Sequence, residues 1–234
     1  MTTALPEVLV ITGTDTHVGK TIVTAALAVA LAESGPVAVY KPAQSGVGPD
    51  EPGDVDEVAR LSGTTMVVEG VRLAEPLAPV TAARRSGIEL PSIAAHVRRA
   101  DELGATYATV LVEGAGGVLV GLDADGNGLI ELARGLRRSY AFVIVCRSAL
   151  GTLNHTALTV DALRSAGHPI LGTVFGCWPT EPDLASRCNA EDLPRITNVP
   201  VLGRIPEGAG RLEPSEFRRA APGWFAAPIN PVLP

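Results

Sequence analysis

Short apolar runs alternate with longer amphipathic segments along this chain of 234 residues. Apolar runs of about four to eight residues are typical of strands buried on both faces, and apolar positions recurring every three to four residues are typical of helices. The runs predict strands at Val8–Thr12, Val37–Lys41, Tyr107–Glu113, Ala141–Cys146, Pro169–Phe175 and Val199–Gly203. The helical periodicity predicts helices at Lys20–Glu33, Asp54–Leu61, Ser92–Leu103, Leu129–Leu136, Leu153–Ala166 and Asp183–Cys188.

This alternation of strands and helices determines the predicted fold class. It is typical of an α/β domain whose mostly parallel central sheet is covered by helices on both faces. We expect residues 1–234 to form a single domain, because no linker, repeat or low-complexity tract interrupts the pattern. Two segments are predicted to lack regular structure. They are a mobile loop at Pro42–Gly53, which is rich in glycine and proline, and a loosely ordered tail from about residue 220.

Composition and charge argue against several classes of protein. The chain is 46% apolar and 19% charged, which suits a full hydrophobic core, and its net charge of −6 argues against binding to nucleic acid or to an anionic membrane surface. No stretch reaches the ~18 apolar residues of a membrane span. Cys146, Cys177 and Cys188 lack CxxC spacing. We therefore expect neither a disulfide framework nor a zinc site, and we expect the protein in the reducing cytoplasm.

Residues 13–21 carry the most specific chemical signal. They read Gly-Thr-Asp-Thr-His-Val-Gly-Lys-Thr and lie between the first predicted strand and the first predicted helix. The backbone N–H groups of such a loop, with Lys20 and the Thr21 hydroxyl, form a cradle for phosphate and Mg²⁺, so the sequence predicts a P-loop nucleotide site. Gly13 stands one residue earlier than in the standard spacing, and an ordinary strand–helix turn is the alternative.

Polar side chains also follow the next two predicted strands. Lys41 ends one strand and Ser45 follows it, where they can contact a bound anion; a surface lysine beside a turn is the alternative. Glu113 closes the other strand and precedes Gly-Ala-Gly-Gly. A carboxylate there serves Mg²⁺ in P-loop enzymes, and a structural turn is the alternative. Asp54 and Asp56 are candidates for a second metal carboxylate, with helix N-capping as their alternative role.

Together these segments resemble the dethiobiotin synthetase family. The shared motifs are Gly13-Thr-Asp-Thr-x-Val-Gly-Lys-Thr21, Tyr40-Lys-Pro-x-x-Ser-Gly46, Glu75-Pro-x-x-Pro79, Val112-Glu-Gly-Ala-Gly-Gly117 and Leu153-Asn-His155, spanning roughly residues 8–206. The resemblance implies a P-loop NTPase fold and a C–N-bond-forming cyclo-ligase of biotin biosynthesis that uses ATP and Mg²⁺. Such enzymes join CO₂ or bicarbonate carbon to 7,8-diaminopelargonate through a carbamate and a carbamic-phosphoric anhydride, and close a cyclic urea. The resemblance also implies a homodimer.

The resemblance further implies a role for each matching residue. Lys20 and Lys41 are the expected catalytic cations, and the expected Mg²⁺ ligands are Thr21, Asp54 and Glu113. The rest of the nucleotide site is expected to comprise His17, Val18, Gly19, Ile22, Gly114, Ala115, Gly116, Gly176, Cys177, Ile205, Pro206 and Glu207. The substrate site is expected to comprise Thr16, Lys41, Ser45, Pro79, Gly117, Gly151, Thr152 and Asn154. Within it, Thr16 and Ser45 would hold the carbamate, and the neighbouring subunit would supply Gly151–Asn154 for the substrate's tail carboxylate.

Two positions depart from the family's pattern. His17 stands where an acidic residue is common, and Gly176 stands where an asparagine usually reads the adenine edge. Glycine offers no amide for this contact, and we expect the smaller residue to leave space that another base can use. We therefore predict that a pyrimidine triphosphate such as CTP is accepted at least comparably to ATP.

Two other functions remain open on the sequence alone. A partitioning-type P-loop ATPase switch would share the fold, but such proteins usually carry a second lysine early in the loop, and none occurs between Gly13 and Gly19. An amidotransferase-type synthase of cobalamin chemistry would share the Thr-Asp-Thr loop. Such chains usually add a glutaminase domain, for which 234 residues leave no room.

Overall fold

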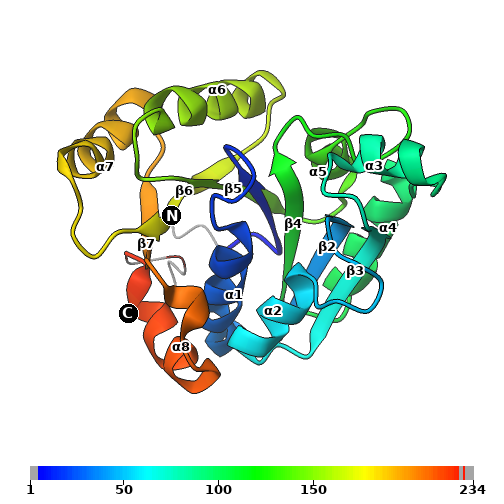
Figure 1. Ribbon diagram of the computed structural model, residues 1–234, viewed down its shortest axis with the longest axis horizontal. Coiled ribbons are helices and arrows are strands. Elements are labelled where there is room, and N and C mark those ends of the chain that lie inside the picture. The colour runs from blue at the N-terminus through cyan, green and yellow to red at the C-terminus, as the bar shows by residue number, and fades with distance from the viewer. Residues whose placement is uncertain (1–4, 227–228, 230–234) are drawn as a thin grey trace.

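The computed structural model describes residues 5–226 and 229. The strands are β1 (Val8–Gly13), β2 (Val37–Ser45), β3 (Met66–Leu73), β4 (Thr109–Gly117), β5 (Tyr140–Cys146), β6 (Ile170–Trp178) and β7 (Val201–Pro206). They form one seven-stranded sheet in the order β3-β2-β4-β1-β5-β6-β7, with parallel pairing throughout (Figure 1). The predicted α/β class with a parallel central sheet is confirmed.

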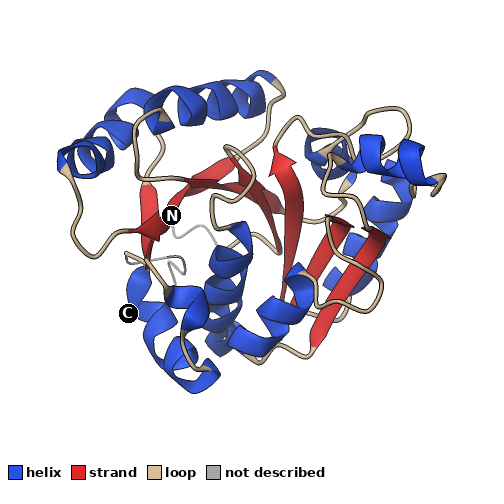
Figure 2. Cartoon of the chain, viewed as in Figure 1, coloured by secondary structure: helices blue, strands red, loops and turns tan. Residues whose placement is uncertain are grey.

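Helices cover both faces of the sheet (Figure 2). They are α1 (Lys20–Leu31), α2 (Asp54–Ser62), α3 (Pro79–Ser86), α4 (Ile93–Gly104), α5 (Leu129–Gly135), α6 (Thr152–Ser165), α7 (Leu184–Thr197) and α8 (Pro214–Ala220), with short 3₁₀ helices at Ala32–Ser34, Ala209–Arg211 and Ala221–Trp224. One face packs against α1, α2 and α8, and the other against α4, α5 and α6. No described helix has the length and apolar character needed to cross a membrane.

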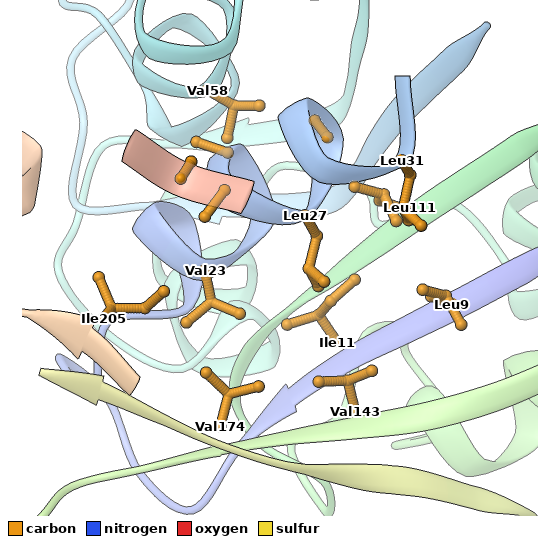
Figure 3. Packing of buried hydrophobic residues seen from close by; sticks show 14 of the residues in the cluster. Leu9, Ile11, Val23, Leu27, Leu31, Val58, Leu111, Val143, Val174 and Ile205 are labelled. Carbon is orange, nitrogen blue, oxygen red and sulfur yellow. The ribbon is translucent and has the colours of Figure 1, made fainter. Parts of the chain in front are cut away.

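The alternation of side chains along β1 explains why its sequence is apolar throughout. Leu9 and Ile11 belong to the core on the α1 side, whereas Val8 and Val10 belong to the core on the opposite side. Figure 3 shows Leu27 of α1 beside Ile11 and the neighbouring strands. A strand buried on both faces has no solvent-facing position, so the usual alternation of apolar and polar residues is absent.

The order of the strands determines where a ligand can bind. The strands β2, β3 and β4 lie on one side of β1, and β5, β6 and β7 lie on the other. In open α/β sheets, ligands bind beyond the carboxyl ends of the strands, where the winding changes direction. The segments that follow β1, β2 and β4 therefore lie at the same edge of the sheet.

One strand and two α-helices were not predicted. The strand β3 lies at the sheet edge, most of its residues are only half-buried, and Glu69, Gly70 and Arg72 interrupt its apolar run. The helices α3 and α8 each begin with a proline and bury few apolar side chains. A pattern of apolar runs detects elements by the core they bury, so all three escaped it.

Several predicted boundaries need correction. The strands β4, β6 and β7 each continue past their predicted ends, to Gly117, Trp178 and Pro206. Pro42–Gly53 is not wholly a loop, because β2 continues through Ser45, and α7 continues past the predicted end at Cys188 to Thr197. In the tail, residues 221–224 form a 3₁₀ helix and Phe225 pairs with Gly203, so regular structure continues past residue 220. Residues 227, 228 and 230–234 lie outside the described residues.

Candidate active site

The loop between β1 and α1 wraps around the side chain of Lys20. Lys20 is 7% exposed, and its Nζ donates to the Asp15 carbonyl at 3.0 Å. Gly19 has a φ of +97° directly before α1, a conformation that glycine adopts readily. A Cβ at Gly13 would lie 2.7 Å from the Asp15 carbonyl oxygen and 2.9 Å from Lys20 Nζ. The early glycine therefore allows the loop to close tightly on the lysine.

Lys41 of β2 contacts two carboxylates, one at the start of α2 and one in the neighbouring strand β4. Its Nζ lies 2.5 Å from Asp54 Oδ2 and 2.7 Å from Glu113 Oε1. The Thr21 hydroxyl donates to Glu113 Oε1 at 3.1 Å. The side chains of Lys41 and Glu113 are almost fully buried, whereas that of Asp54 is 34% exposed. The strands β2 and β4 and the first turns of α1 and α2 thus bring these four groups into contact.

Burial and charge oppose each other in this cluster. Burial disfavours the Lys41 ammonium, but the Glu113 and Asp54 carboxylates outweigh that effect and raise the pKa of Lys41 above its usual value. Burial, with the nearby charge of Lys41, lowers the pKa of Lys20 to about 8. Burial opposes ionisation of Asp54, but Lys41 holds the pKa of this carboxyl below its usual range. The pKa values of the two lysines are thus shifted in opposite directions, upward for Lys41 by its carboxylate partners and downward for Lys20 by burial.

The oxygen donors of the cluster fit a hard divalent cation. Thr21, Asp54 and Glu113 offer a hydroxyl and two carboxylates, a donor set that Mg²⁺ accepts when phosphate oxygens and water complete its shell. Asp56 has a different role, because its Oδ2 accepts from the Gly53 N–H at 2.7 Å in a capping box of α2. Among the described residues, no three His, Cys, Asp or Glu side chains are grouped to hold a metal. A cation here would thus depend on Thr21 and on the nucleotide.

These groups line one cavity of about 810 Å³. This volume lies within the range of about 300–1,000 Å³ that is usual for small-molecule sites. The cavity brings together residues predicted from separate motifs: Thr16, His17, Gly19, Lys20, Thr21, Ile22, Lys41, Ser45, Asp54, Pro79, Glu113, Ala115 and Gly116. Val18 of the P-loop and Gly114 and Gly117 of β4 are not among its lining residues.

Known proteins are similar to this chain over almost all of its length. A family model described as an AAA domain matches residues 7–211. The chain is 55% identical over 220 residues to the ATP-dependent dethiobiotin synthetase BioD of Rhodococcus jostii (strain RHA1), covering 94% of each chain. It is 53% identical over 224 residues to BioD of Streptomyces coelicolor, covering 95% of this chain and 93% of the other. This chain belongs to the dethiobiotin synthetase family.

The fold is shared beyond the dethiobiotin synthetase family. The septum site-determining protein MinD of Pyrococcus horikoshii, solved with Mg-ADP, matches with a TM-score of 0.59 over 93% of this chain and 90% of its own, at 17% identity. At this identity the similarity shows the fold alone. The full-length similarity to dethiobiotin synthetases therefore disfavours the partitioning-type ATPase as an interpretation of this chain.

Gly176, near the end of β6, packs directly against the P-loop. A Cβ at Gly176 would lie 2.0 Å from the Val18 carbonyl oxygen, and a Cβ at Gly19 would lie 2.4 Å from the Gly176 carbonyl oxygen. The expectation of free space at Gly176 is therefore wrong, because backbone of the P-loop fills it. Gly176 still offers no side-chain amide to a base.

The other residues expected at the nucleotide base lie at the adjoining strand ends. Cys177 is exposed, Ile205 is buried and Pro206 is exposed. The Glu207 N–H donates to the Trp178 carbonyl at 2.8 Å, which joins the ends of β6 and β7. These residues are outside the lining of the 810 Å³ cavity, so their contact with a base stays a prediction.

The segment expected to bind the substrate's tail lies at the start of α6. Gly151 precedes this helix with a φ of +90°, Thr152 is buried and Asn154 is exposed. None of the three lines the cavity of its own chain. Their predicted contact with the substrate's tail in a neighbouring subunit stays a prediction.

Sequence reasoning missed two polar side chains that support the site. The Gln44 side chain is 5% exposed, and its Oε1 accepts from the Asp54 N–H at 2.9 Å. Arg147 Nη2 lies 2.9 Å from Asp15 Oδ2 in the P-loop. Gln44 lies near the end of β2 and Arg147 directly follows β5. Their place at the carboxyl ends of strands is the signal that could have identified them.

Proposed function

We propose that this protein is an ATP-dependent dethiobiotin synthetase that joins CO₂ to 7,8-diaminopelargonate and closes the ureido ring. The observation that supports this chemistry best is the convergence of Lys20, Lys41 and the Thr21–Asp54–Glu113 donor set on one cavity beside the P-loop. The reaction gathers negative charge on a carbamate and on a transferring phosphoryl group. Fixed cations are most effective where such charge develops.

The first step is attack of one substrate amine on CO₂, which forms a carbamate and releases a proton. Lys41 and the hydroxyls of Thr16 and Ser45 line the same cavity and would hold this anion. A carbamate oxygen then attacks the γ-phosphorus of the nucleotide and releases the nucleoside diphosphate. The second amine attacks the carbon of the resulting anhydride, forms the second C–N bond and expels phosphate.

The chain's own residues would hold the phosphates during transfer. Lys20 and the N–H groups at the start of α1 would bind the phosphate oxygens. Mg²⁺ at Thr21, Asp54 and Glu113 would neutralise part of the phosphate charge. Because Lys41 contacts both carboxylates, its ammonium would have to turn toward the carbamate when these oxygens bind a metal.

We also propose that CTP serves at least comparably to ATP. The support is the absence of an amide at Gly176, which leaves base recognition to backbone groups near Cys177 and to Ile205–Glu207. Competition binding of ATP, CTP, GTP and UTP tests this proposal. An ATP preference over CTP of more than about a hundredfold, roughly 2.7 kcal/mol, would contradict it. A Gly176→Asn variant is a poor probe, because its Cβ would collide with the Val18 carbonyl.

We further propose a cytoplasmic homodimer whose sites each borrow Gly151–Asn154 from the partner subunit. Leu150 and Leu158 beside and on α6 are 80% and 61% exposed, and exposed apolar side chains support contact with another chain. Light scattering should report a dimer. Mixing inactive Lys41→Ala with inactive Asn154→Ala subunits should restore activity, because one site of each mixed dimer is intact. A fully active monomer contradicts the proposal.

The proposed reaction predicts that phosphate release needs both diaminopelargonate and bicarbonate. A phosphate-release assay with each omitted in turn provides the test. A synthetase releases phosphate only when both are present, because the carbamate is the attacking group. Release that is unaffected by omission of either would instead indicate an ATPase switch.

A further inference from the structure

The loop that leads into Asp54 contains few apolar side chains that could hold it in place. It runs from Gly46 to Gly53 between β2 and α2, and it reads Gly-Val-Gly-Pro-Asp-Glu-Pro-Gly. Asp54 is the first residue of α2, so the path of this loop determines where its carboxylate lies. A carboxylate that meets Lys41 and a metal has to be held to within a fraction of an ångström.

Arg72 of the edge strand β3 donates hydrogen bonds to the backbone of this loop. Its Nη1 donates to the Gly48 carbonyl at 3.0 Å and to the Glu51 carbonyl at 2.5 Å. The remaining edge of the guanidinium binds Glu69 through two bonds, from Nε at 2.7 Å and from Nη2 at 2.9 Å. One planar side chain thus joins β3 to two separate carbonyls of the loop.

The contact extends to the residue directly before Asp54. A Cβ at Gly53 would lie 3.0 Å from Arg72 Nη2 and 3.3 Å from Gln44 Oε1, so Gly53 packs closely against both side chains. Gln44 is the register partner of Arg72 in the β2–β3 pair, and it accepts from the Asp54 N–H. Two neighbouring residues of the sheet therefore fix the loop and the start of α2.

We propose that Arg72 is a positioning residue that places Asp54 for metal binding. Arginine suits this task because its rigid fork can bind a carboxylate along one edge and carbonyls along the other, which a lysine ammonium cannot do. The inference rests on the proposed function only for the role of Asp54 as a metal ligand. It assigns Arg72 no contact with substrate or nucleotide.

The test is Mn²⁺ binding by isothermal titration calorimetry to the full chain with a non-hydrolysable nucleotide. Arg72→Met should raise the Mn²⁺ Kd at least tenfold, while the Kd of the metal-free nucleotide changes by less than twofold. Arg72→Lys should show an intermediate rise, and it serves as the measured variant if Arg72→Met does not fold. Asp54→Asn should raise the Mn²⁺ Kd at least as much as Arg72→Met.

Arg60 provides a matched control. It also forks onto a glutamate three residues earlier, Glu57, with two bonds of 2.7 Å, and it donates to the Gly210 carbonyl at 2.8 Å. Arg60→Met should therefore lose the same kinds of bond but leave the Mn²⁺ Kd within twofold of wild type.

An unchanged Mn²⁺ Kd in folded Arg72→Met or Arg72→Lys would overturn the proposal. So would an equal rise in Arg60→Met, or an unchanged Kd in Asp54→Asn. Failure of the proposed function is distinguishable, because it would show as absent product formation by the wild type. Metal binding by the wild type can be measured independently of that outcome.

Discussion

Replacing Lys41 by methionine removes the cation between Asp54 and Glu113 while keeping most of the side-chain volume. Lys41 is 3% exposed, and its Nζ lies 2.7 Å from Glu113 Oε1. The variant leaves the carboxylate of Glu113, which is 1% exposed, without this cation. We expect lower stability, loss of turnover and stronger binding of a divalent cation by the two freed carboxylates.

The size of the stability loss follows from burial. Removing one partner of a buried ion pair costs about 3–5 kcal/mol. The Asp54 side chain is 34% exposed, so solvent screens its interaction with Lys41. We therefore expect a stability loss at the lower end of this range, about 3 kcal/mol. For a chain of this length, each kcal/mol corresponds to about 2–4 °C, so the unfolding midpoint should fall by about 6–12 °C.

Thermal unfolding followed by circular dichroism, in chelator and in saturating MgCl₂, measures this effect. Mg²⁺ should recover most of the lost stability in Lys41→Met, because it replaces the missing cation, and it should change the wild-type midpoint much less. Lys41→Arg serves as a control that keeps the charge. A Lys41→Met midpoint within about 2 °C of wild type in chelator would show that Lys41 does not stabilise the buried carboxylates. A variant that Mg²⁺ does not stabilise would contradict cation binding at Asp54 and Glu113.

Three further predictions concern metal, loop packing and pH. Glu113→Gln should raise the Mg²⁺ concentration for half-maximal turnover at least tenfold, about 1.4 kcal/mol. An unchanged Mg²⁺ titration would show that Glu113 has a structural role and does not bind the metal. Gly176→Ala should weaken nucleotide binding at least tenfold by calorimetry, because the added Cβ meets the Val18 carbonyl oxygen at 2.0 Å; equal affinity would contradict this. Burial lowers the pKa of His96 below 6.5. The unfolded chain therefore takes up more protons as the pH falls through 6.5, and stability drops toward acid. Urea unfolding should show that the free energy of unfolding falls less steeply toward acid pH in His96→Gln than in wild type. Equal pH dependence in the two proteins would contradict a contribution from His96.

The sequence predicted the features that local patterns determine. Apolar runs ending in Lys41 and Glu113 identified the strands β2 and β4, although each strand continues four residues further, to Ser45 and Gly117. Parallel strands place their carboxyl-terminal halves toward one edge of a sheet. Thr16, Lys20 and Thr21 could be assigned to the P-loop for the same reason, since strand, glycine loop and helix follow one another directly.

Contacts between distant segments could not be predicted in this way. Whether Asp54 or Asp56 faces Lys41 depends on the path of the preceding loop, which Arg72 and Gln44 fix from the neighbouring strands. The close approach of Gly176 to Val18 depends on how β6 packs beside the P-loop. The missing amide at Gly176 could be identified in the sequence, but the backbone that fills the space could not.

The most direct test of the proposed synthetase function is incorporation of ¹³C-bicarbonate into dethiobiotin by the purified protein. The reaction would contain 7,8-diaminopelargonate, Mg²⁺ and each of ATP, CTP, GTP and UTP in turn, with the product detected by mass spectrometry. We expect ¹³C-labelled dethiobiotin with ATP and with CTP, in amounts equal to the phosphate released. Phosphate release with no labelled product for all four nucleotides would contradict the proposed function.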